Sequence, residues 1–299
     1  SNIGAAFLET IDDAGAAVQV QIAAGTARSP TTVATGGVAL DPQGSGSSTV
    51  SVASAAFTTV PASSVDVTVT EPGISVTPVT VGAGLQFGTR QAVLGATNHG
   101  GVTVTIRSAN PGVLQIAPDG NTAGADSIQV FVADGQNRAN YWVQGVEGVT
   151  GTVSIIARAD GFTDGTSTVD VVQPAVELLS LGTSYSVDNS DVNFRARVGI
   201  PNGNDTFLSS VQSVRPGGGD KTVTFTSSDP SAADLVTSAG TQNGAVDLTL
   251  AELTSTTPTT VAAGGVALDF LSVGSTLVQA SVPGFITVTN GTRNVTITP

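Results

Sequence analysis

The chain has 299 residues, of which 40% are hydrophobic, so it can fill cores of its own and intrinsic disorder is excluded. Its formal net charge of −13 excludes a basic surface for binding nucleic acid or anionic lipid. It has no cysteine and no methionine, which excludes a disulfide-stabilised fold and suits an oxidising, extracellular environment.

The composition also predicts an all-β fold. The apolar residues are mostly Val and Ala, with many Thr and Ser among them, and β-branched side chains favour strands over helices. Thirty-six Gly and 14 Pro supply frequent turns between short strands. No apolar run approaches the roughly 18 residues that a transmembrane helix needs, so no membrane insertion is expected.

The first part of the chain contains a segment that recurs near its end. Residues 30–41 read PTTVATGGVALD and residues 258–269 read PTTVAAGGVALD, which differ only at Thr35 and Ala263. Two further strands follow the first copy, in GSSTVSVASAAF and in SVDVTVTEP, which ends at Pro72. An internal repeat of this kind indicates tandem copies of one domain.

The alignment of the copies indicates that residues 1–72 are the later half of a repeat. It places Asn2 opposite Asn110 and Asp229, which lie in the middle of their own copies. A β-sandwich cut at this point lacks its first strands and leaves sheet edges bare. We therefore expect either preceding strands in a longer protein or strand complementation by another subunit.

The middle copy, residues 73–174, shows the alternating pattern of half-buried strands. Tyr141 and Trp142 lie on opposite faces of one expected strand, and we expect Trp142 to anchor the core. Strands are predicted at GISVTPVTV (73–81), QAVLGA (91–96), GVTVTIRS (101–108), VLQI (113–116), SIQVFVA (127–133), NYWVQG (140–145), TVSIIARA (152–159) and STVDVV (167–172).

A shared motif links the middle copy with the third copy, residues 175–299. VTIRSANPG at 104–112 matches VTFTSSDPS at 223–231, and each is followed by an apolar strand and a Gly-containing turn. This pattern resembles the bacterial Ig-like domains of invasin and intimin type, especially their second group. The resemblance implies tandem immunoglobulin-like β-sandwich domains of a surface protein, here with limits 1–72, 73–174 and 175–299.

The sequence offers no set of groups for catalysis. His99 is the one histidine and lies in a turn-like TNHGG, no G-x-S-x-G elbow occurs, and the Asp residues lie mostly in turns. We therefore do not expect an enzyme; facing carboxylates of a polysaccharide-active enzyme are the least favoured alternative.

Calcium is the one cofactor for which the sequence offers candidates. Turn-forming Asp and Asn residues supply oxygen ligands, although no EF-hand loop is present. The candidate ligands are Asp119, Asn121 and Asp126 in one loop, Asp160 and Asp164 in another, and Asp188 and Asp191 in a third.

Two functions fit a repeated scaffold. The first is a structural segment of a large extracellular or cell-surface stalk or filament protein, whose partners are further copies of itself or neighbouring Ig-like domains. The alternative is an adhesin module that recognises protein or carbohydrate through loops or sheet edges. Its candidate binding residues are Arg138, Asn140 and Tyr141, the one polar and aromatic cluster without a counterpart in the other copies.

Overall fold

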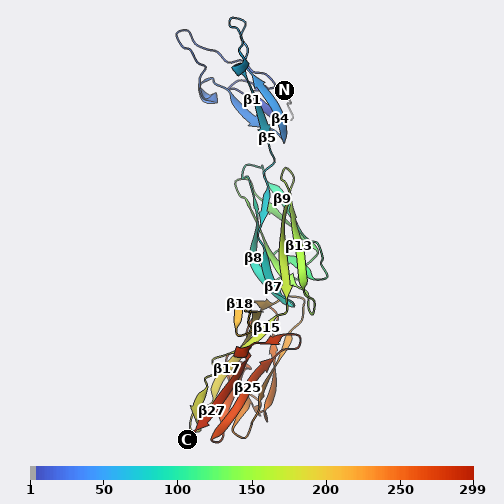
Figure 1. Ribbon diagram of the computed structural model, residues 1–299, viewed down its shortest axis with the longest axis vertical. Helices are drawn as coiled ribbons and strands as arrows, with labels where there is room; N and C mark the ends of the chain where they lie inside the picture. Colours follow the sequence, from blue (N-terminus) through green and yellow to red (C-terminus); the bar gives the residue numbers. More distant parts are fainter. Residues whose placement is uncertain (1–4) are drawn as a thin grey trace. The chain divides into compact units, whose positions relative to one another are not determined.

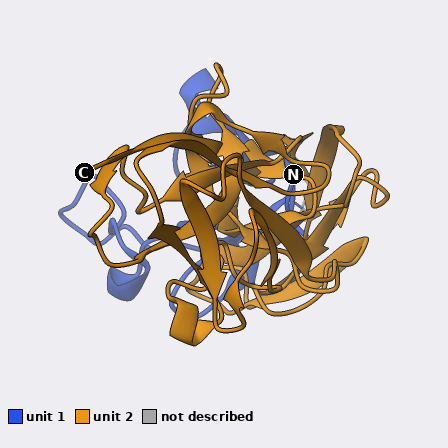
Figure 2. Ribbon diagram, turned by 90° about the horizontal axis from the view of Figure 1, so that it is seen from below, with its two compact units in different colours: residues 1–73, 161–163 blue, residues 74–160, 164–299 orange. Residues whose placement is uncertain are grey.

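The computed structural model describes residues 5–299, and within them the fold is all-β, as predicted. The helical segments of these residues are four short 3-10 turns, and none of their helices is long and apolar enough to span a membrane. Asn2 lies outside the described residues. The chain divides into two compact units (Figure 2): unit 1 is Ser1–Gly73 with Gly161–Thr163, and unit 2 is Ile74–Asp160 with Asp164–Pro299.

Unit 1 contains two small antiparallel sheets, drawn in blue in Figure 1. In one sheet β1 lies between β2 and β3, and in the other β4 pairs with β5. The elements are β1 (Ala6–Glu9), β2 (Ala14–Gly15), η1 (Val33–Thr35), β3 (Ala39–Pro42), β4 (Gly46–Ser51), η2 (Pro61–Ser63) and β5 (Ser64–Val69).

The first part of unit 2, the middle sandwich, has the two packed sheets of an Ig-like domain. One sheet has the order β11-β9-β13-β14-β7, and the other contains β10, β12 and β8, with β6 beside β8. The strands are β6 (Ile74–Val76), β7 (Val79–Gly82), β8 (Leu85–Leu94), β9 (Val102–Ser108), β10 (Leu114–Ala117), β11 (Ser127–Val132), β12 (Arg138–Gly145), β13 (Gly151–Arg158) and β14 (Gly165–Val172).

The apolar residues whose alternation predicted these strands also form the core of the middle sandwich. Val104 and Ile106 of β9 are fully buried between the sheets, whereas Thr103 and Arg107 are exposed. Seven of the eight predicted strands are confirmed, although β8 begins at Leu85 rather than near Gln91. The single strand predicted over 73–81 is wrong, because this segment forms β6 and β7, which belong to different sheets.

The predicted roles of Tyr141 and Trp142 are wrong. Tyr141 is fully buried in the core, and Trp142 is half-buried with its indole lying over Gly88 and Gly120. The register of β12 against β8 shifts between Tyr141 and Val143, because Gly88 and Thr89 of β8 together lie opposite Trp142, so the bulge is in β8. Tyr141 lies on the same face of β12 as the buried Ala139 and Val143, so it takes the core position that was expected for Trp142.

The second part of unit 2, the third sandwich, also has two sheets. Its core contains the edge-to-face pair Phe194 and Phe225, with ring centroids 5.5 Å apart. The elements are β15 (Ala175–Leu179), β16 (Ser184–Ser186), β17 (Val192–Pro201), β18 (Leu208–Val211), β19 (Ser213–Val214), β20 (Lys221–Ser227), β21 (Ala233–Thr237), β22 (Gly240–Thr241), β23 (Ala245–Leu250), η3 (Val261–Ala263), β24 (Val266–Phe270), β25 (Gly274–Ser281), β26 (Ile286–Thr287), η4 (Thr289–Gly291) and β27 (Thr292–Thr298).

The motif that links the second and third copies forms the same turn in both. Asn110 and Asp229 each use the backbone carbonyl to accept two N–H groups at the start of the following strand, at 3.1 to 3.2 Å. The preceding Ser108 and Ser227 are both buried. The motif is therefore a structural turn of the sandwich.

Candidate functional site: the junction of the two sandwiches

Several buried polar contacts of unit 2 lie where the two sandwiches meet, and we call this region the junction. It comprises Thr80–Gln86, Gln115 and Glu147 of the middle sandwich, Gln173 and Pro174, and Gln212–Arg215 with Lys221 of the third. Its backbone contact is a short antiparallel ladder between β8 and β19, in which Ser213 opposes Gln86 and Val214 opposes Leu85. A strand of the third sandwich thus extends a sheet of the middle sandwich.

Gln212 extends this ladder through its side chain. Its Oε1 accepts a hydrogen bond from the Gly82 N–H at 2.9 Å, and its Nε2 donates to the Thr80 carbonyl at 3.0 Å. The side chain is 3% exposed, so both amide groups are satisfied inside the protein. The amide therefore pairs with β7 as a backbone strand would.

Arg215 forms the charged contact of the junction. Its Nε donates to Glu147 Oε1 at 2.8 Å and its Nη2 donates to Glu147 Oε2 at 2.5 Å, a bidentate pair. Its Nη1 donates to Gln115 Oε1 at 2.8 Å. Because the Arg215 residue is only 8% exposed, this charge is held by its partners and not by solvent.

Glu147 receives charge from two cations. Lys221 Nζ lies 3.6 Å from Glu147 Oε1, in addition to the Arg215 contact. Burial by itself raises the pKa of Glu147, but hydrogen bonds and the positive charges of Arg215 and Lys221 outweigh burial and hold that pKa below its ordinary value. The carboxylate therefore stays ionised at neutral pH and acts as the anionic centre of the junction.

The junction also contains an apolar contact. Leu85 begins β8 of the middle sandwich, is fully buried, and belongs to the core cluster that contains Val176, Val198 and Val214 of the third sandwich. Burying a leucine side chain contributes about 2 kcal/mol. The two sandwiches accordingly share part of one core.

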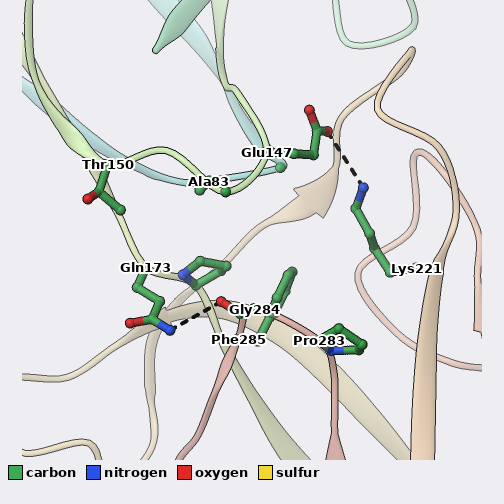
Figure 3. Close-up of a pocket in the computed structure, with 11 residues that line it drawn as sticks. Ala83, Glu147, Thr150, Gln173, Lys221, Pro283, Gly284 and Phe285 are labelled. Carbon is green, nitrogen blue, oxygen red and sulfur yellow. Dashed lines mark hydrogen bonds and ion pairs between the residues drawn. The ribbon is translucent and has the colours of Figure 1, made fainter. Parts of the chain in front are cut away.

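A cavity of about 550 Å³ lies beside these contacts (Figure 3). Glu147 and Lys221 face each other across one part of it, and Gln173 Nε2 donates to the Gly284 carbonyl at 3.2 Å in another. Phe285 lines the cavity and packs against the core of the third sandwich. The two ionisable residues of the lining are paired with each other, so the geometry serves attachment better than proton transfer.

The predicted calcium candidates are not brought together. Asp119 Oδ1 accepts the Asn121 and Thr122 N–H groups at 2.8 and 2.9 Å, which closes its own turn, and Asp164 pairs with Arg158 at 2.7 Å. Within residues 5–299 no three His, Cys, Asp or Glu side chains are placed to hold a metal ion. Calcium stays an expectation without a built site.

The third candidate loop lies near another carboxylate. Asp191 is close enough to Asp269 to raise its pKa, after burial, which is the larger cause. Asp188 N–H is bonded instead to the Ser186 hydroxyl at 3.3 Å, and so belongs to a turn.

The predicted binding cluster is partly wrong. Arg138 and Asn140 are exposed on β12, and the Asn140 side chain accepts a hydrogen bond from Gln91 at 3.1 Å. Tyr141 cannot contact a partner at the surface because it points into the core, where burial raises the pKa of its hydroxyl in spite of the nearby Arg90.

His99, expected in a surface turn, lies in such a turn and is half-buried. Its Nε2 is 2.9 Å from the Gln136 carbonyl, and Asp134 Oδ1 accepts the backbone N–H groups of His99 and Gly100. The hydrogen bonds from Gly100 and His99 lower the pKa of Asp134. These contacts hold the turn between β8 and β9.

Sequence reasoning missed Gln212, Arg215 and Glu147. The scarcity of charge was a usable signal for Arg215. Only 11% of the residues are charged, so an Arg that directly precedes PGGG is unusual in this sequence. Its partner could not be named, because Glu147 lies 68 residues away in a different sandwich.

The chain was compared with family models, curated proteins and solved structures. No family model matches the chain, and no curated protein matches its sequence. Among solved structures it is similar to the adhesin InvE of Yersinia pseudotuberculosis, with a TM-score of 0.28 and 14% identity over 77% of this chain and 59% of that one.

The chain is also similar to two further solved structures. The D00-D0 domain of intimin has a TM-score of 0.30 and 12% identity over 76% of this chain and 100% of that one. Domains 5-6 of the S-layer protein SbsC have a TM-score of 0.25 and 18% identity over 76% and 98%. At these TM-scores the similarities do not indicate a function for this chain.

Proposed function

We propose that the chain is a structural segment of an extracellular surface protein, in which the junction joins the middle and third sandwiches into one stiff body. The observation that carries this proposal is the sheet that continues from β8 into β19, reinforced on both sides by the side chains of Gln212 and Arg215. A flexible linker leaves domains free to rotate, whereas a shared sheet and a shared core fix them.

The acidic charge and the lack of oxidisable sulfur support an extracellular location. The paired charges of the junction and the turn-forming roles of Asp119 and Asp134 support a non-catalytic role. No observation favours the adhesin alternative, since the residues proposed for it do not form one exposed cluster.

Distance measurement between spin labels tests the stiffness of the junction. The chain has no cysteine, so Ser127→Cys on β11 and Thr249→Cys on β23, both exposed, introduce one labelling site in each sandwich. We expect a narrow distance distribution in the parent chain. Arg215→Ala leaves Glu147 without its bidentate partner and removes about 3 kcal/mol from the junction, so the distribution should broaden.

Arg138→Ala is the matched control, because it deletes an exposed arginine of β12 that lies outside the junction. It should leave the distribution unchanged. A distribution that is already broad in the parent chain, or one that Arg215→Ala does not alter, would refute a stiff junction.

A further inference from the structure

Unit 1 repeats the later half of the third sandwich element by element. The pairing of Leu8 with Leu40 in unit 1 corresponds to that of Leu235 with Leu268 in the third sandwich. In the second sheet, β4 and β5 pair in the same register as β25 and β27 over their whole common length. The third sandwich is therefore an internal template for unit 1.

The template has strands that unit 1 does not contain among its described residues. β24 lies between β21 and β17, with Phe194 of β17 opposite Val266, whereas β3 pairs with β1 alone. Similarly, β25 lies between β27 and β20, whereas β4 pairs with β5 alone. Both open edges of unit 1 correspond to edges that are filled in the third sandwich.

The open edges leave apolar side chains in solvent. Val266 and Leu268 of β24 are fully buried, but their counterparts Val38 and Leu40 are 43% and 37% exposed. Ile22 is 53% exposed, and lies in a segment that aligns with β23 but forms no strand. In the third sandwich β23 pairs only with β20. The described residues of unit 1 contain no counterpart of β20, which accounts for the absence of a strand at Ile22.

We propose that unit 1 is an acceptor for strands that come from outside residues 5–299, and that the donor segment has the chemistry of β17 and β20. The donor is extended, carries apolar residues at alternate positions, and pairs antiparallel with β3 through the register that Val192, Asn193 and Phe194 adopt on β24. This proposal concerns assembly and does not depend on the stiffness of the junction.

The acceptor edge already has the geometry of the filled one. The glycines that follow the 3-10 turns, Gly36 and Gly264, have φ/ψ values of 89°/18° and 88°/15°. On the template, Asn193 Oδ1 accepts the Val261 N–H at 3.0 Å, and the corresponding donor in unit 1 is the Val33 N–H. Little rearrangement is therefore needed before a donor strand binds.

A synthetic peptide with the sequence of residues 192–201 is the probe, added in excess to the complete chain. Hydrogen exchange measured by mass spectrometry should show that the segment 27–41 slows by about tenfold or more, because its backbone N–H groups and those of the new strand become paired. The third sandwich should not respond, since its own β17 already occupies β24.

Two matched variants keep the test specific. A peptide that carries Phe194→Asp has the same length and backbone and should give no protection, because an unpaired carboxylate would enter an apolar face. In the chain, Leu40→Asp should abolish the protection in unit 1, and the exchange of segment 258–269 reports that the third sandwich stays folded.

Three outcomes would overturn the proposal. They are no protection of segment 27–41 at saturating peptide, equal protection by the Phe194→Asp peptide, and protection that is already present without peptide and grows with chain concentration. The last outcome would show that β3 pairs with a second copy of unit 1, which sedimentation of the chain without peptide would record as a dimer.

Discussion

Unit 1 and the third sandwich contain nearly the same twelve residues in two different settings. At residues 30–41 and 258–269 the 3-10 turn, the left-handed glycine after it and the register of the following strand are the same. The exposure of the strand differs, because β24 has β17 on its second edge and β3 has no such partner among residues 5–299. Local conformation is therefore encoded within the segment, and burial is encoded by strands far away in the sequence.

The largest effect on stability is expected when the equivalent leucines of β24 and β3 are each replaced by Ala. Leu268→Ala should destabilise unit 2 by about 2–5 kcal/mol, since Leu268 is fully buried in the core of the third sandwich. Leu40→Ala should cost less than about 1 kcal/mol, since Leu40 is 37% exposed. Calorimetry should show a fall of several degrees in the melting temperature of unit 2 for the first variant only.

Equal effects of these two variants would show that β3 is buried as deeply as β24 in solution. The destabilisation caused by Leu40→Ala should also be measured with the peptide of residues 192–201 added. If that strand fills the edge of β3, it should raise the cost of Leu40→Ala towards that of Leu268→Ala.

A smaller test asks whether the local geometry is needed in both settings. A Cβ on Gly37 would lie 2.5 Å from the Pro30 carbonyl oxygen, and a Cβ on Gly265 would lie 2.6 Å from that of Pro258. Gly37→Ala and Gly265→Ala should therefore each destabilise their own turn by about 1–3 kcal/mol. Hydrogen exchange of segments 30–41 and 258–269 should accelerate in the respective variant. A neutral Gly37→Ala would contradict the shared geometry.

Sequence patterns predicted what is encoded locally. Alternation in β9 and the turn at Asn110 and Asp229 were readable, because each depends on a few neighbouring residues. The bulge of β8 opposite Trp142 was not, since it arises from the register of β12 against β8. The junction was missed for the same reason, because the groups that Arg215 and Gln212 contact lie far away in the sequence.

The smallest effect concerns an aspartate that both copies share. Asp269 lies on β24, and burial, followed by the charge of Asp191, raises its pKa above the ordinary value. A carboxyl group whose pKa is higher in the folded state favours folding while it is protonated and loses this contribution as the pH rises through the folded pKa. Asp269→Asn removes that loss, so it should raise the melting temperature of unit 2 at pH 7 by about 1–2 °C.

The gain from Asp269→Asn should disappear below about pH 4, where the parent carboxyl group is itself protonated. Asp191→Asn should give part of the same gain, and the double variant less than the sum, because the two carboxylates act on each other. The counterpart Asp41→Asn should leave unit 1 unchanged, since Asp191 precedes β17 and the described residues of unit 1 contain no equivalent strand. Thermal melts of the three single variants at pH 7 and pH 3.5 measure this. An equal gain in melting temperature from Asp269→Asn at both pH values would show that repulsion between carboxylates does not cause the gain. An equal gain from Asp41→Asn would show that the strand preceded by Asp191 does not distinguish the two copies.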